Sequence, residues 1–230
     1  MSTPGPFQDK PARDDLAPNQ RVQGERAGPT SVQDAPALRV EALSLARGGR
    51  VLFEYLSFTA EAGAYVEIRG ANGAGKTSLL RAIAGFLRPR AGRIAFDRIE
   101  EPALALHYVA HLNALKPTAS VAAHVRYWAS LFGGAGGADA LERVGLAGLE
   151  DRQARTLSQG QARRLSLARL IAAPRPIWLL DEPAAALDAQ GHEIVARLIE
   201  AHRQDGGLVL AAVHEALGPA PSQTLAIGAA

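Results

Sequence analysis

Gly70-Ala71-Asn72-Gly73-Ala74-Gly75-Lys76-Thr77 is the most specific indication of the fold in this sequence. It fits the phosphate-binding pattern G-x-x-x-x-G-K-[ST], in which glycines let the backbone wrap closely around a nucleoside triphosphate. The loop is expected to open a helix, because the amides and dipole of a helix N-terminus favour anions. Lys76 is then expected to reach the β- and γ-phosphates, and the Thr77 hydroxyl to hold Mg²⁺.

The residues on both sides of the loop supply the context that this motif needs. Residues 65–69 alternate in polarity and predict a strand, and residues 77–84 predict a helix. A glycine-rich turn before an ordinary amphipathic helix is the alternative, and the order strand, loop, helix argues against it.

Bulk composition bounds the class of protein. The chain has 230 residues, enough for one full domain with a subdomain, and 47% of them are hydrophobic. The absence of cysteine excludes disulfides and thiolate chemistry. Lysine plus arginine total 25 and aspartate plus glutamate total 23, so charge alone does not indicate nucleic acid. No apolar run is long enough to cross a bilayer, and we expect another chain to supply any membrane spans.

The first 36 residues differ from the rest of the chain. They hold six prolines, mixed charges and few large apolar side chains, so they cannot bury enough surface to offset the entropy of ordering. We predict a disordered tail at 1–36 and one domain at 37–230.

Strands alternate with helices through that domain, which predicts an α/β fold with a largely parallel sheet. Residues 120–173 contain no convincing strand and predict a helical insertion. The expected strands are 38–46, 51–60, 93–96, 105–110, 177–180 and 208–213, and the later helices are 159–173 and 189–203.

A pair of carboxylates follows the apolar strand 177–180. Asp181 and Glu182 stand at its C-terminal end, where ligands bind in open α/β sheets. Asp181 is expected to hold Mg²⁺ through water, and Glu182 to act as general base on the attacking water. A surface pair of acids that merely ends a strand is the alternative.

Residues 157–161, Leu-Ser-Gln-Gly-Gln, precede the predicted helix 159–173. Exposed N–H groups, the Ser158 hydroxyl and the flexibility of Gly160 make this segment a second candidate anion site, which includes Gln161. A serine at such a position is otherwise an N-cap.

In this order, the three signals resemble the ATP-binding subunits of ABC transporters, over about residues 38–228. The resemblance implies a P-loop NTPase core with an antiparallel β subdomain and a helical subdomain at about 116–173. It also implies a head-to-tail homodimer, in which ATP and Mg²⁺ lie between the phosphate loop of one chain and Ser158, Gly160 and Gln161 of the other. His214 is similar to the histidine that contacts the γ-phosphate, and residues 186–188 to a loop that contacts the opposite subunit.

Within that family, residues 110–116 and 160–164 most resemble the cytochrome c biogenesis ATP-binding export subunit, also called the haem exporter ATP-binding subunit. The resemblance implies two copies on two membrane-spanning permease subunits, at the cytoplasmic face of the inner membrane. ATP hydrolysis would drive haem export or the release of a haem chaperone, with no nucleic acid involved.

Three departures from the family pattern stand out. His111 occupies the place of the usual glutamine, where an imidazole could orient water or contact metal-bound water. The adenine-stacking residue is open among Arg47, Phe53 and Tyr55. Alanines replace polar residues at 184 and 185.

Two aromatic residues suggest a docking surface. Tyr127 and Trp128 lie in the helical insertion, and aromatic residues are enriched at interfaces. We predict that 116–131 helps to form the groove for the membrane subunit, with burial of both aromatics in the core as the alternative.

Other classes of protein remain as rivals: another ABC exporter, a soluble ABC ATPase, a small P-loop kinase, or a module gated by ATP without hydrolysis. A soluble ATPase that acts on DNA would need a basic surface. We interpret the arginine cluster on and after the predicted helix 159–173 as solvated helix surface; its members are Arg163, Arg164, Arg169 and Arg175.

Overall fold

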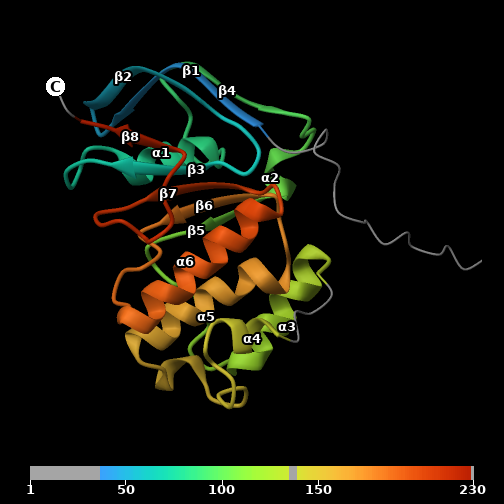
Figure 1. Cartoon of the computed structure of the whole chain (residues 1–230). Coiled ribbons are helices and arrows are strands. Elements are labelled where there is room, and N and C mark those ends of the chain that lie inside the picture. Colours follow the sequence, from blue (N-terminus) through green and yellow to red (C-terminus); the bar gives the residue numbers. More distant parts are fainter. Residues whose placement is uncertain (1–36, 135–138, 229–230) are drawn as a thin grey trace, which may run out of the picture.

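Two sheets and two groups of helices are stacked in layers (Figure 1). The computed structural model describes residues 37–134 and 139–228, so the predicted disorder of 1–36 lies outside the described residues. Among the described residues, no helix combines the length and the apolar character that crossing a bilayer requires.

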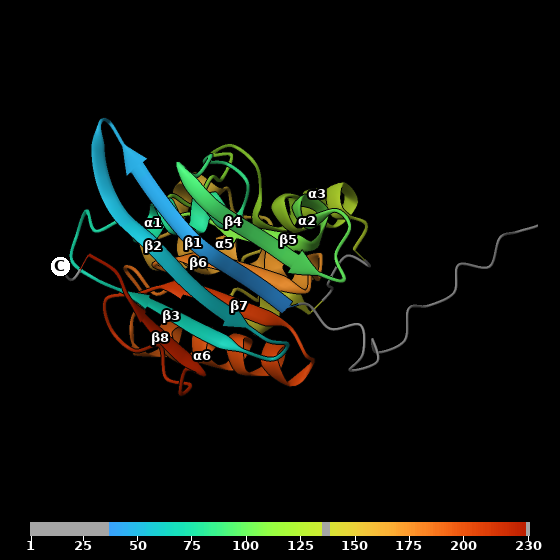
Figure 2. The same ribbon diagram turned by 90° about the horizontal axis from the view of Figure 1, so that it is seen from above.

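The first layer is an antiparallel sheet with the order β2-β1-β4. It consists of β1 (Ala37–Arg47), β2 (Arg50–Ala60) and β4 (Ala91–Asp97). Gly48 and Gly49, both with positive φ, form the turn between β1 and β2, as the sequence predicts. Figure 2 shows these three strands lying over the second sheet.

The second sheet has the order β5-β6-β7-β3-β8 and is parallel throughout. Its strands are β3 (Tyr65–Arg69), β5 (Leu106–Val109), β6 (Ile177–Asp181), β7 (Leu208–Ala212) and β8 (Gln223–Ala226). The prediction of an α/β fold with a parallel core is confirmed. Parallel strands bring their carboxyl ends to one edge, so the loops after β3, β5, β6 and β7 meet there.

Helix α1 (Lys76–Ile83) lies between the two sheets. Leu79 and Leu80 have no exposed surface and pack in one core cluster with Leu38 of β1 and with Ile177 and Leu179 of β6. Trp178 and Leu180, the alternate residues of β6, belong to the other cluster. Because β6 is buried on both faces, it fixes the position of the carboxylates that follow it.

The longer of the remaining helices cover the other face of the parallel sheet. Helices α5 (Gln159–Ala172) and α6 (Ala189–Gln204) lie next to it, and α3 (Val121–Phe132) and α4 (Ala140–Arg143) pack beyond them (Figure 1). The described structure also has two short elements, α2 (Pro102–Ala105) and the 3₁₀ turn η2 (Ala154–Thr156).

The structure separates the two aromatics of the predicted docking surface. Trp128 is 7% exposed and belongs to the core cluster under α5, so its assignment to an interface was wrong. Its ring faces His124, and consecutive helical residues point in different directions. Tyr127 is 61% exposed and remains available for contact with another molecule.

Candidate functional site

The loop between β3 and α1 can close only because of its glycines. A Cβ on Gly70 would lie 2.3 Å from the carbonyl oxygen of Ile227, so no other residue fits without a shift. Gly75 is the N-cap of α1 and has φ 111°, a backbone conformation that L side chains rarely adopt. The rest of the predicted loop, Ala71, Asn72, Gly73 and Ala74, lies between these two points, largely exposed to solvent.

Lys76 reaches back across this loop. Its Nζ donates hydrogen bonds to the carbonyl oxygens of Gly70 at 2.8 Å and Ala71 at 3.2 Å. The side chain is 6% exposed, and the described structure gives it no carboxylate partner. The loop therefore holds an ammonium group in place beside the helix N-terminus, which fits the phosphates of a nucleotide.

Thr77 and Asp181 come together although 104 positions separate them. The Thr77 hydroxyl donates to Asp181 Oδ1 at 2.9 Å. Asp181 is 2% exposed, and the Tyr108 hydroxyl lies 3.4 Å from its other carboxylate oxygen. A hydroxyl and a carboxylate beside a phosphate loop are the oxygen ligands that Mg²⁺ prefers, so this pair fits the metal.

Glu182 lies between two imidazoles. Its Oε1 is 2.9 Å from His214 Nε2, and its Oε2 is 3.1 Å from His111 Nδ1. Its side chain is 28% exposed, so solvent reaches the carboxylate. Its backbone has φ 52°, which is uncommon outside glycine, and its N–H donates to the Ala212 carbonyl. The three side chains could hold and orient a water molecule between them.

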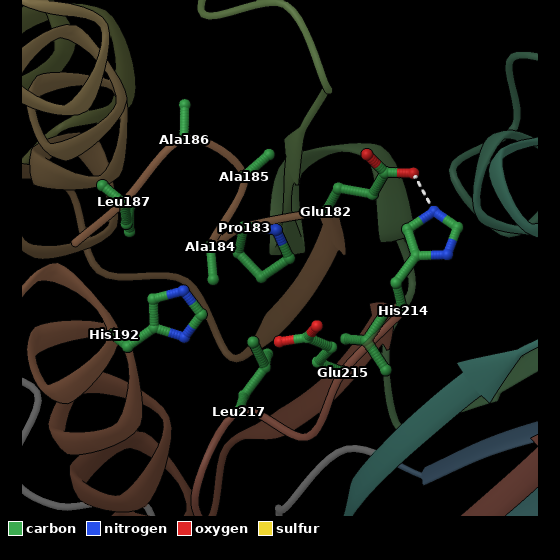
Figure 3. Close-up of a pocket in the computed structure, with 11 residues that line it drawn as sticks. Glu182, Pro183, Ala184, Ala185, Ala186, Leu187, His192, His214, Glu215 and Leu217 are labelled. Atoms are coloured by element: carbon green, nitrogen blue, oxygen red, sulfur yellow. Dashed lines mark hydrogen bonds and ion pairs between the residues drawn. The ribbon is translucent and has the colours of Figure 1, made fainter. Parts of the chain in front are cut away.

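A pocket opens beside this group (Figure 3). Glu182 and His214 line it together with the loop after β6, the start of α6 and the loop after β7. Figure 3 shows the His214 ring turned toward the Glu182 carboxylate. Ala184 and Ala185 leave this wall apolar, whereas His192 and Glu215 add titratable groups to it.

The second candidate anion site forms the start of α5. Ser158 Oγ accepts from Gln161 N at 3.1 Å, and Gln161 Oε1 accepts from Ser158 N at 3.0 Å, which is a capping box. Gly160 lies against the Ala186 carbonyl, where a Cβ would approach to 3.2 Å. Among the described residues, no hydrogen bond joins Ser158 or Gln161 to the phosphate loop of the same chain.

Two residues next to the candidate site were not predicted from the sequence to belong to it: Arg163 and Tyr108. Arg163 is 2% exposed, so its interpretation as solvated helix surface was wrong. Its guanidinium lies under the loops that follow β5 and β6, and burial lowers its pKa against the opposing influence of Asp181 and Glu182. Burial likewise raises the pKa of Tyr108, which contacts Asp181. Tyr108 lies in the predicted strand 105–110 and Arg163 in the family-like stretch 160–164, but neither side chain shows in the sequence that it is buried beside the candidate site.

The three candidates for adenine stacking differ in their surroundings. Phe53 packs on the phosphate loop, and a Cβ at Gly75 would lie 3.3 Å from its ring. Arg47 is exposed, and Tyr55 is 76% exposed on the outer sheet. The choice among them stays open.

The family profile described as ABC transporter matches residues 53–185, more than half of the chain. A protein named cytochrome c biogenesis ATP-binding export protein CcmA from Rhodopseudomonas palustris strain BisB5 is 48% identical; the match covers 82% of this chain and 96% of that protein. The protein of the same name from Cereibacter sphaeroides is 44% identical, with 82% and 87% covered.

A solved structure agrees with these matches. The structure of cbiO1 from Clostridium perfringens, described as part of the ABC transporter complex cbiONQ, superposes with a TM-score of 0.66 at 27% identity. The superposition covers 77% of this chain and 78% of that one.

Proposed function

This chain belongs to the ABC transporter family, among its cytochrome c biogenesis ATP-binding export proteins, and we propose that it powers a membrane complex that handles haem for c-type cytochromes. Family membership makes it an ATPase that works with membrane-spanning partners. The residues at the carboxyl edge of its parallel sheet would carry out the nucleotide chemistry of that task.

The ATP site is proposed at the phosphate loop, from Gly70 to Thr77. Lys76 would pair with the β- and γ-phosphates, since its ammonium already lies across the loop. Thr77 and Asp181 would hold Mg²⁺, which supplies charge neutralisation on the phosphate oxygens when bound. The 2.9 Å contact between these two side chains supports the assignment.

Glu182 is proposed as the general base. It would accept a proton from the water that attacks the γ-phosphorus. His214, whose Nε2 contacts one carboxylate oxygen of Glu182 in this structure, would contact the γ-phosphate. His111, in the place of the family's usual glutamine, would fix the other oxygen. Two imidazoles in contact with one carboxylate leave it fewer rotamers, so the base would be oriented before the nucleotide arrives.

We propose that two copies form the working unit. Ser158, Gly160 and Gln161 form an exposed helix start that makes no hydrogen bond to the phosphate loop of its own chain in the described structure. A head-to-tail pair would bring this anion site to the γ-phosphate on the other chain. ATP would then join the chains, and hydrolysis would release them.

The proposed unit is the domain at 37–230, whose helical subdomain spans about 116–173, with residues 1–36 as a tail. Two copies would sit on two permease subunits, peripheral to the cytoplasmic face of the inner membrane. Hydrolysis would drive haem export or release a haem chaperone. Another ABC exporter with a different cargo is the second candidate, because the family profile alone does not fix the cargo.

The observation that carries this proposal is the Thr77–Asp181 contact one residue before Glu182, in a chain 48% identical to a protein named for cytochrome c biogenesis. The test is complementation of bacteria that lack the native gene. The wild-type chain should restore covalently attached haem on c-type cytochromes, measured by haem staining. Glu182→Gln, expressed and membrane-associated to the same level, should restore none. Restoration by Glu182→Gln would contradict the role of hydrolysis, and failure of the wild type with its own permease would contradict the cargo.

A further inference from the structure

Arg163 is a buried cation at the catalytic edge to which the proposed reaction assigns no task. It lies on α5, five residues after Ser158. The five N–H groups of its guanidinium meet six acceptors, all of them neutral, because the two N–H groups of Nη1 are shared among three. Nε donates to Pro183 O at 3.0 Å, Nη2 to Asp181 O at 2.8 Å and Glu182 O at 2.7 Å, and Nη1 to Ala110 O at 2.7 Å, Asn113 Oδ1 at 3.2 Å and His111 O at 3.4 Å.

Burying a charged guanidinium costs free energy that an apolar side chain packed in the same place would not cost. A charge removed from water needs a partner, and no carboxylate oxygen contacts Arg163 in the described structure. The charges of Asp181 and Glu182 nearby oppose the lowering of its pKa by burial. What only arginine can supply here is a rigid fork of five N–H donors, which a lysine or an apolar side chain cannot replace.

The fork joins two loops that carry the candidate catalytic groups. Nη2 and Nε hold three consecutive carbonyls from Asp181 to Pro183, so they fix the turn in which Glu182 has φ 52°. A left-handed residue of this kind persists only where its surroundings hold it. Nη1 holds the chain at Ala110 and His111, which sets the other side of the Glu182–His111 contact.

We propose that Arg163 is a positioning residue for ATP hydrolysis, which holds the Glu182 turn and the His111 loop at the separation that the attacking water requires. The proposal rests on the role of Glu182 as general base. It assigns Arg163 no contact with ATP, because its hydrogen bonds all go to the protein. Replacement should therefore slow the chemical step and leave nucleotide binding intact.

The test compares Arg163→Lys and Arg163→Gln with Arg164→Lys in the full chain, purified with its membrane partners. Arg164 is the matched control, since it is on the same helix but donates to Val144 and Gly145 in the helical layer. For both Arg163 variants we expect kcat to fall about tenfold or more, because small misplacements of catalytic groups cost that much. KM for ATP should stay within about threefold of the control. Thermal unfolding should remain cooperative.

Each other outcome counts against the proposal. A kcat within about twofold of the control would mean that the loops hold their geometry without Arg163. A raised KM with unchanged kcat would make it a binding residue, and loss of cooperative unfolding in both variants would make it a scaffold residue. Glu182→Gln in the same assay separates this inference from the function on which it rests. If Glu182→Gln keeps wild-type turnover, Glu182 is not the general base and the proposed function is contradicted. If Glu182→Gln loses turnover but the Arg163 variants keep it, only the inference about Arg163 is contradicted.

Discussion

At the scale of single residues, the candidate site depends on a few side-chain contacts around Glu182. A carboxylate only accepts hydrogen bonds, so the contact at 2.9 Å has His214 Nε2 donating to Glu182, while His111 Nδ1 lies 3.1 Å from the other carboxylate oxygen. In a neutral His214 ring that donates from Nε2, the other nitrogen, Nδ1, is an acceptor to which a water molecule can donate. The placement of His111 and His214 around Glu182 is seen in the structure and does not follow from a sequence motif.

The first prediction concerns the contribution of Lys76 to ATP affinity. Lys76→Ala removes the ammonium that bridges the carbonyls of Gly70 and Ala71 and would face the phosphates. We expect ATP affinity, measured by equilibrium binding, to fall by about 10- to 100-fold, in line with the loss of a hydrogen bond to a charged group. Lys116→Ala, which removes an exposed lysine, is the control and should bind normally. Equal affinity in the two variants would contradict the assignment.

A second prediction concerns two buried histidines to which the proposed reaction assigns no role. Burial lowers the pKa of His107 and of His202 to about 4. His107 lies against the Ala173 carbonyl, whereas His202 stacks on Trp178 with ring centroids 3.8 Å apart. Both are neutral in the folded chain at neutral pH.

Proton linkage sets the direction of the resulting pH dependence. The unfolded chain binds these protons near pH 6.5 and the folded chain only near pH 4, so stability is fully present above pH 6.5 and falls as the pH drops between these values. Each histidine contributes at most about 1.4 kcal/mol per pH unit. Urea unfolding at pH 7 and pH 5 should show a smaller difference for His202→Phe, which keeps the stack, than for the wild type. An unchanged difference would refute the assignment for His202.

At the scale of elements, sequence patterns predicted what local chemistry determines. The phosphate loop, β3, α1 and the buried strand β6 were predictable, because glycine spacing and apolar runs specify them without distant partners. Strand β8 was missed: only Leu225 is buried in its four residues, and its place comes from pairing with β3. The fold class is confirmed, whereas the roles of the site residues remain predictions.

Arg163 was missed for a related physical reason. Four arginines on and after one predicted helix look alike in a sequence, since helical spacing does not tell which of them lies under a sheet edge. Arg163 is buried because it packs under the ends of β5 and β6. Those strand ends are more than 15 positions away from it in the sequence, one before it and one after it. Tertiary context of this kind is not available from periodicity alone.

Helix α3 carries the prediction at this scale. Trp128→Ala should lower the free energy of unfolding by about 3–5 kcal/mol, because it opens a cavity in the core cluster. Tyr127→Ala should change it by less than about 0.5 kcal/mol, as exposed substitutions do. If α3 contacts the membrane subunit, Tyr127→Ala should also reduce co-purification with that subunit. Normal co-purification would remove Tyr127 from the interface.

At the scale of the whole molecule, one chain holds two candidate anion sites that no hydrogen bond joins in the part of the chain that the structure describes. One candidate site, at the edge of the parallel sheet, consists of the phosphate loop, Asp181 and Glu182. The other is at the start of α5, where Ser158 is the N-cap and makes its hydrogen bonds with Gln161 of the same helix. The central claim is that a second copy supplies its Ser158 site to the phosphate loop when ATP is bound. Because the chain has no cysteine, two engineered thiols can test this without background.

The measurement is ATP-dependent cross-linking between a chain with Asn72→Cys and a chain with Gln159→Cys, both exposed positions, in the Glu182→Gln background. A short bifunctional thiol reagent should join the two variants when ATP is present, and two Asn72→Cys copies should not be joined. The head-to-tail account predicts this mixed product with ATP and its loss with ADP. No mixed product in a sample that binds ATP, or the same yield without nucleotide, would contradict it.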